Sequence, residues 1–231
     1  MKRTHDRFYL NEDNKKVKQS FVEVADEISK YNFQTIADIG CATGAFPNYL
    51  KNRFQHAEVI GIEYLDSLLT KARKDFPHLN FIKGDVLDTN SVPKKFDVIT
   101  MLGVLGIFDN YKTVLDNVIQ WLNPHGILVM QNLVSDYDID VFIKYKPSSV
   151  DYEEDELESG WNIISYKSLE AAAKANNSQL VFSKDFYLAT KLEKKKDVMR
   201  SWTELNPLGK NDIFNALHIR QPQKIVVIQK Q

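Results

Sequence analysis

One stretch of the sequence decides the fold, and it reads Ile36-Ala37-Asp38-Ile39-Gly40-Cys41-Ala42-Thr43-Gly44-Ala45-Phe46. Its first residues predict a buried strand, and a helix is expected to begin near Ala45. Gly40 and Gly44 have no Cβ, so the turn between strand and helix can adopt positive φ angles and lie close against a ligand. Asp38 stands at the carboxyl end of the strand, where open α/β sheets bind their ligands. A carboxylate there suits a cationic or hydroxyl-rich ligand and repels a bare phosphate.

The composition is that of an ordinary globular chain. Of its 231 residues, 43% are hydrophobic and 26% are charged, which argues against disorder and fits one large domain. The formal net charge of -1 gives no overall attraction to nucleic acid or to a membrane. No apolar run could span a bilayer or serve as a signal peptide, so we expect a cytoplasmic protein. The single cysteine and five scattered histidines predict neither a disulfide nor a metal site.

Short apolar strands alternate with amphipathic helices along the chain. Strands are predicted at about 34–39, 57–62, 79–83, 96–102, 127–130, 180–183 and 224–228. Helices are predicted at about 18–31, 45–54, 65–75, 111–121 and 166–175, the last capped by Ser165, and a turn at Asn123–Gly126. This alternation is typical of an α/β fold in which helices cover both faces of a mostly parallel sheet.

Three of the predicted strands deliver a carboxylate to one edge of that sheet. Asp38 and Glu63 end the first and second strands, and Asp85 follows the third. Right-handed crossovers place the carboxyl ends of parallel strands at the same edge. Like charges that converge there would repel one another, so a ligand that carries hydrogen-bond donors or positive charge is expected at this edge.

Two segments are too long for ordinary connections and are interpreted as lid or substrate insertions in a single domain that spans residues 1–231. They lie at about 135–160, which is acidic, and at about 188–221, which is basic and aromatic. Tyr137, Tyr145 and Trp161 suit either a pocket wall or a packed core. The pair Phe8-Tyr9 suits packing and a lid over a ligand equally well. The charge runs Asp151–Glu158 and Lys194-Lys195-Lys196 are interpreted as solvated surface.

Two other interpretations of the glycine turn were weighed. A dinucleotide-binding loop of the form G-x-G-x-x-G would place a diphosphate at the start of the helix. Here Ala42 and Ala45 take the places of its second and third glycines, and Asp38 would repel the diphosphate. A turn without a ligand would leave the carboxylates at Glu63 and Asp85 unexplained. Cys41 is interpreted as a small residue of the loop rather than a nucleophile.

In order and spacing these motifs resemble the class I S-adenosylmethionine-dependent methyltransferases of small-molecule type, over residues 20–185 and the final strand. The family's first motif, an acidic residue followed by x-glycine-x-x-x-glycine, is matched by Asp38, Gly40 and Gly44. The resemblance implies a Rossmann-like doubly wound sheet of seven mostly parallel strands, with an antiparallel last strand and helices on both faces. It also implies S-adenosylmethionine as cofactor and S-adenosylhomocysteine as product.

The resemblance further assigns the cofactor to four strand ends. The glycine loop would lie against methionine and ribose, Glu63 would hold the ribose hydroxyls, Asp85 would read adenine, and the segment after the fourth strand would flank the methionine. The full set of expected cofactor-binding residues is Asp38, Gly40, Cys41, Ala42, Thr43, Gly44, Glu63, Tyr64, Asp85, Val86, Met101, Leu102 and Gly103.

The sequence does not identify the methyl acceptor. Many small-molecule members carry a Glu-His pair after the fourth strand, and residues 103–108 lack it. No general base is assigned, and His5, Tyr9 and Tyr137 are the candidates. Motifs of adenine, glutamine and cytosine methylation are missing, so the expected partner is a small-molecule acceptor, such as a sugar or natural-product intermediate, methylated on O or N. Alternatives are an RNA methyltransferase that uses residues 188–221, and a cofactor-binding protein without transfer. The oligomeric state is not predicted.

Overall fold

The computed structural model describes residues 9–11, 16–146, 148, 157–196 and 199–231. Its centre is a sheet with the strand order β3-β2-β1-β4-β5-β12-β9, and the two-residue strand β8 (Ile164–Ser165) pairs with β5 beside this path. β12 is antiparallel to both of its neighbours, whereas the other strands of the path are parallel. The predicted Rossmann-like α/β class is therefore confirmed. The strands of the path are β1 (Thr35–Ile39), β2 (Glu58–Glu63), β3 (Asn80–Lys83), β4 (Phe96–Leu102), β5 (Leu122–Ser135), β9 (Ser178–Asp185) and β12 (Gln223–Lys230).

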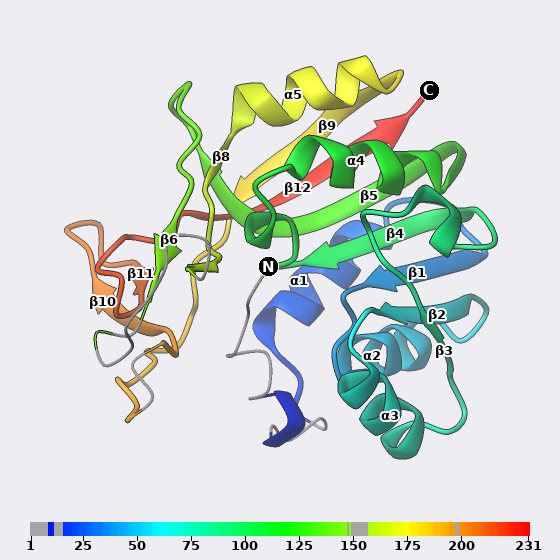
Figure 1. Ribbon diagram of the computed structural model, residues 1–231, viewed down its shortest axis with the longest axis horizontal. Coiled ribbons are helices and arrows are strands. Elements are labelled where there is room, and N and C mark those ends of the chain that lie inside the picture. Colours follow the sequence, from blue (N-terminus) through cyan, green and yellow to red (C-terminus); the bar gives the residue numbers. More distant parts are fainter. Residues whose placement is uncertain (1–8, 12–15, 147, 149–156, 197–198) are drawn as a thin grey trace.

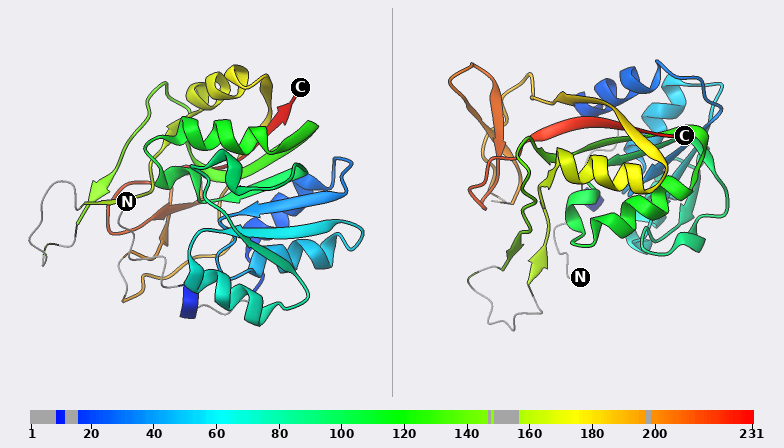
Figure 2. Two further views of the ribbon diagram at one scale, coloured as in Figure 1. Left: turned by 45° about the vertical axis from the view of Figure 1, so that its right-hand side comes forward. Right: turned by 90° about the horizontal axis from the view of Figure 1, so that it is seen from above.

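Helices cover both faces of this sheet (Figures 1 and 2). One face carries α1 (Gln19–Ile28), α2 (Ala45–Arg53) and α3 (Asp66–Asp75), and the other carries α4 (Tyr111–Gln120) and α5 (Tyr166–Ala175). Strand alternation divides the core in two, because successive side chains point to opposite faces. In β4, Val98 packs with α1 and α2, whereas Ile99 and Met101 pack with α4. The Ser165 hydroxyl accepts the Ser168 amide at 3.1 Å, which confirms the predicted cap of α5.

The predicted turn at Asn123–Gly126 is wrong as a separate element. These residues belong to β5, which is longer than its apolar core at 127–130 suggests. Pairing with β4 shifts there: Phe96 faces Leu122, and Val98 faces Ile127. The extra residues form a bulge in which His125 has a φ of 63°, and the Asn123 side-chain amide donates to Asp97 at 2.8 Å. The polar residues do mark a bend, but the strand continues on both sides of it.

Both insertions form two-stranded hairpins. The first contains β6 (Lys144–Tyr145) and β7 (Glu158–Ser159), and the second contains β10 (Trp202–Leu205) and β11 (Asn211–Phe214). Figure 1 shows these strands beyond the edge toward which the arrowheads of β1 and β4 point, and Figure 2 shows the two insertions on either side of that edge. Most of the acidic run Asp151–Glu158 lies outside the described residues. Both insertions are thus placed beside the ligand edge of the sheet.

None of the helices in the part of the chain that the structure describes is long and apolar enough to cross a membrane.

Candidate functional site

The glycine turn joins β1 to α2 in a left-handed conformation. Gly40, Ala42 and Gly44 have φ angles of 68°, 49° and 85°. The amides of Gly40 and Cys41 both donate to the carbonyl of Ile62, at 2.8 and 3.1 Å, so the turn is fastened to β2. A Cβ atom on Gly40 would lie 2.5 Å from Cγ2 of Val104, which follows β4. Glycine is required here both for the φ angle and for this close approach.

Substituting Gly40 with alanine should therefore destabilise the fold in two separable ways. The positive φ costs an L-residue roughly 1–2 kcal/mol, and the overlap with Val104 adds to this. Gly209→Ala is the matched control, because Gly209 has a φ of 71° and nothing within 4 Å of its would-be Cβ. We expect a larger fall in melting temperature for Gly40→Ala than for Gly209→Ala, and partial recovery when Val104→Ala is added. Equal falls for the two glycine variants would contradict the close approach.

Asp38 is a buried carboxyl group at the end of β1. Its side chain is 4% exposed and accepts a hydrogen bond from the Thr100 hydroxyl of β4 at 2.7 Å. Burial raises the pKa of Asp38 to about 7, the hydrogen bond from Thr100 opposes this shift, and the charge of Glu63 adds to it. The group therefore changes charge near neutral pH, and a cation placed beside it would favour its ionised form.

Glu63 connects the second strand to the glycine turn. Its carboxylate, 7% exposed, accepts the Ala42 amide at 2.9 Å on one oxygen. The other oxygen accepts the amides of Tyr64 and Leu65 at 2.8 and 2.9 Å. The sequence predicted a ligand contact for Glu63, and the structure adds that this carboxylate also holds the turn. These hydrogen bonds fix the orientation of the carboxylate at the end of β2.

The remaining predicted residues lie along the same edge in different environments. Asp85 is half-buried, and its carboxylate accepts the Leu87 amide at 2.9 Å. Val86 and Thr43 are buried, Leu102 and Ala42 are half-buried, and Tyr64 is exposed. Gly103 is exposed, has a φ of 70° and has nothing within 4 Å of its would-be Cβ, so there is open space beside it.

Two of the predicted residues contribute to the core. Met101 is 1% exposed and packs in the cluster under α4, so a ligand at this edge would meet its backbone rather than its side chain. Cys41 is buried against the aromatic rings of Phe76 and Phe81. Burial, with the charges of Asp38 and Glu63, raises the pKa of the Cys41 thiol well above its usual value. This environment agrees with a small loop residue and not with a nucleophile.

Two of the three candidate bases, Tyr9 and Tyr137, lie among the described residues. Tyr137 is 77% exposed, and His5 lies outside the described residues. Tyr9 packs against two cations, with Lys18 5.6 Å and Arg200 6.0 Å from its ring centre, so it joins the start of α1 to the second insertion. Trp161 packs against Tyr145, 5.6 Å between ring centres, within the first insertion. The catalytic base stays unassigned.

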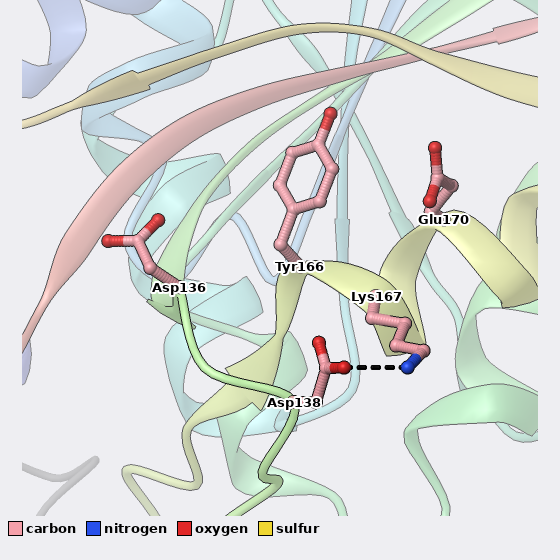
Figure 3. Close-up of a pocket in the computed structure, with 5 residues that line it drawn as sticks. All are labelled: Asp136, Asp138, Tyr166, Lys167 and Glu170. Atoms are coloured by element: carbon pink, nitrogen blue, oxygen red, sulfur yellow. Dashed lines mark hydrogen bonds and ion pairs between the residues drawn. The ribbon is translucent and has the colours of Figure 1, made fainter.

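A cavity of about 520 Å³ lies at the junction between the end of β5 and the first turn of α5 (Figure 3). Lys167 and Asp138 form an ion pair of 2.6 Å at its rim, as the dashed line in Figure 3 marks. The cavity is open and polar, and none of the predicted cofactor residues lines it. It is therefore distinct from the glycine-turn site. Its lining residues are Asp136, Asp138, Tyr166, Lys167 and Glu170.

The chemistry of the glycine-turn site fits S-adenosylmethionine. The thirteen predicted residues include three carboxylates and no lysine or arginine. Carboxylates accept hydrogen bonds from ammonium, hydroxyl and amino groups, and they repel phosphate. The segment after β4 is open beside Gly103, where a Cβ atom would have no neighbour within 4 Å.

The comparisons with known proteins concern the part of the chain that holds the glycine turn. Residues 36–126 match the family model of a methyltransferase domain. This part of the chain, which includes Glu63 and Asp85, is therefore similar to a methyltransferase domain, and solved methyltransferase structures share the fold of the sheet. Over 110 residues, 48% of the chain, it is 26% identical to the trans-aconitate 2-methyltransferase of Escherichia coli. That alignment covers 43% of the relative, so the chain spans less than half the length of the curated relatives it matches.

Solved structures share the fold over nearly the whole chain. An S-adenosylmethionine-dependent methyltransferase from Clostridium acetobutylicum is 14% identical, with a TM-score of 0.60 over 98% of this chain and 96% of that one. CalS10 from Micromonospora echinaspora, described as an amino pentose methyltransferase, is also 14% identical, with a TM-score of 0.56 over 98% and 95% of the two chains. At this level of identity the likeness concerns the fold.

Proposed function

We propose that this protein transfers the methyl group of S-adenosylmethionine to an oxygen or nitrogen atom of a small molecule. One observation carries the proposal: two hairpin insertions flank the sheet edge that bears Asp38 and Glu63 (Figure 2). Insertions at that place can enclose a small acceptor beside the cofactor and keep bulk water away from it.

The cofactor supplies an activated methyl group on a sulfonium, and the protein positions the two reactants. In this proposal the Asp38 carboxylate faces the cationic methionine part, and Glu63 accepts hydrogen bonds from the ribose hydroxyls. Asp85 accepts from the adenine amino group. An amine acceptor needs only to be presented in its neutral form, whereas a hydroxyl acceptor also needs a base within hydrogen-bond reach.

The names of the similar proteins support a small acceptor without selecting one. One relative is a trans-aconitate 2-methyltransferase, and one structural neighbour is an amino pentose methyltransferase. We propose a metabolite of this size, such as a sugar or a natural-product intermediate. Neither of these two substrates is assigned to this chain.

Calorimetric titration tests the proposal. The purified protein should bind S-adenosylmethionine and S-adenosylhomocysteine at micromolar concentrations and should give no signal with NAD, which serves as the control. Small-molecule acceptors, beginning with carboxylic acids and amino sugars, should then be screened for release of S-adenosylhomocysteine. Failure of a folded protein to bind either sulfur nucleoside would refute the proposal. Tight binding without turnover on any acceptor would favour a binding protein that has lost transfer.

An RNA acceptor is the second candidate, because the second insertion is rich in cations. Several of these cations are engaged within the protein: Lys194 lies 4.6 Å from the ring centre of Trp202, and Lys210 lies 4.4 Å from that of Tyr187. Arg220 pairs with Asp212 at 3.1 Å. This engagement favours packing over phosphate contact. Retention of RNA that weakens steeply with salt would revive the RNA proposal.

A further inference from the structure

Asn162 is a buried amide that joins the first insertion to the segment after β4, residues 103–109. It is 0% exposed and stands two residues before β8. Its side-chain Nδ2 donates to Asp109 Oδ1 at 3.0 Å and to the Phe108 carbonyl at 3.3 Å. Its Oδ1 accepts the amide of Ile143, next to β6, at 2.8 Å. The side chain of Asn162 is therefore hydrogen-bonded both to residues 108–109 and to Ile143, which are far apart in sequence.

The backbone of Asn162 makes a further hydrogen bond to residues 103–109. The Asn162 amide donates to the Gly106 carbonyl at 2.7 Å. The Gly106 amide in turn donates to the side chain of Asn132 on β5, at 3.1 Å. A Cβ on Gly106 would lie 2.8 Å from the Asn162 carbonyl oxygen, so only glycine allows this contact. Residues 103–109 are thus held between β5 and the first insertion.

Charge reinforces this junction on its outer side. Lys144 of β6 pairs with Asp109 and also donates to Ser159 of β7. Asp109 therefore receives donors from both Lys144 and Asn162. The buried amide and the partly exposed ion pair together fasten the base of the β6–β7 hairpin to the segment that begins at Gly103.

We propose that Asn162 is a positioning residue that couples the first insertion to the cofactor side of the site, so that binding the cofactor also steadies the base of the β6–β7 hairpin. The inference rests on the proposed function, because it takes Gly103 and its neighbours as the flank of the methionine part. Coupling between two sites is reciprocal. An acceptor held by the first insertion would therefore strengthen cofactor binding through the same contacts.

Hydrogen exchange of backbone amides tests this inference, with S-adenosylhomocysteine as the probe. In the wild-type protein, the probe should slow exchange in residues 103–109 and also in 141–146. In Asn162→Ala, the first effect should remain and the second should disappear. Without any ligand, the Ile143 amide of this variant should exchange at least about fivefold faster than in the wild type, because its acceptor is gone. Asn215→Ala is the matched control, since Asn215 is equally buried but lies in the second insertion.

A charge exchange separates positioning from simple loss of stability. Asn162→Asp places a carboxylate about 3 Å from the carboxylate of Asp109 at neutral pH, and it should uncouple the insertion as alanine does. Adding Asp109→Asn restores the hydrogen bond between the two side chains, with the amide now at position 109 and the carboxylate at position 162. The protection of 141–146 by the probe should then return. A purely structural role would lower the melting temperature of each variant while leaving that protection intact, which would overturn the inference.

The outcomes also separate this inference from the proposed function. If the probe slowed exchange nowhere in the wild-type protein, the cofactor proposal would fail. Hydrogen exchange without ligand would still test whether Asn162 joins the first insertion to residues 103–109. Equal exchange rates for Ile143 in the wild type and in Asn162→Ala would refute the junction.

Discussion

Replacing Glu63 with alanine is expected to weaken binding of S-adenosylhomocysteine by roughly 1–3 kcal/mol, which is about 5- to 150-fold in affinity. In the proposed binding mode, the ribose hydroxyls lose their charged acceptor in this variant. The glycine turn also loses one of its attachments to β2, because the Ala42 amide donates to this carboxylate, and the amides of Tyr64 and Leu65 lose their acceptor as well. Orphaned donors of this kind cost roughly 1–3 kcal/mol each where they are buried. We therefore expect lower stability together with lower affinity.

Controls on the same strand separate these two effects. Glu58→Ala removes a carboxylate at the other end of β2, where it pairs with Lys94 at 2.6 Å on the surface, and it should change neither quantity by much. Glu63→Gln keeps the length of the side chain but loses the charge and one acceptor. Calorimetric titration should be combined with chemical denaturation of each variant. Unchanged affinity in a folded Glu63→Ala variant would show that this carboxylate serves the turn alone.

The sequence predicted those parts of the site that depend on local pattern. Asp38, Gly40 and Glu63 follow apolar strands directly, and the common direction of parallel strands is enough to bring their ends together. The burial of Met101 also follows from alternation, because it shares the parity of Ile99, which packs under α4. Met101 was predicted as a ligand contact from its place at the end of the strand, without regard to the direction of its side chain.

The contacts made by the insertions were not predictable in the same way. Asn162, Asn132 and Gly106 are ordinary residues in their local context, and the hydrogen bonds that connect these three join residues 26 and 56 positions apart. Nothing in the spacing of polar residues within a long loop specifies such partners. The bulge in β5 could not be predicted from the local sequence either. Asn123 and Gly126 are typical of a turn, and only the pairing with β4 shows the bulge.

The second large effect concerns pH. Between about pH 4 and pH 7 the free energy of unfolding should fall by an amount on the order of 4 kcal/mol because of Asp38 alone. Burial raises the pKa of this group from 3.8 to about 7 in the folded protein. In this window the unfolded chain has released the proton that the native protein still holds. Stability falls as pH rises wherever the native state binds more protons than the unfolded state.

The difference between wild type and Asp38→Asn isolates this contribution. The amide oxygen can still accept the Thr100 hydroxyl, but the group no longer titrates. In denaturant unfolding, the variant should therefore match the wild type below about pH 4 and should become more stable than it between about pH 4 and pH 7, with the full difference present near pH 8. Asp97, Asp109 and Asp140 have lowered pKa values, so their contributions are lost only in more acidic solution and do not overlap this window. A stability difference that does not vary with pH would show that Asp38 is ionised throughout.

The same proton links Asp38 to the cofactor. A protonated carboxyl group offers no charge to the ammonium and sulfonium of S-adenosylmethionine, so its affinity should rise with pH by up to about tenfold per unit below pH 7 and then level off. Binding near pH 6 should release a proton, and the calorimetric enthalpy should then change with the ionisation enthalpy of the buffer. Asp38→Asn should remove both the pH dependence and the proton release. An affinity that stays flat in the wild type would place the cationic part of the cofactor away from this carboxylate.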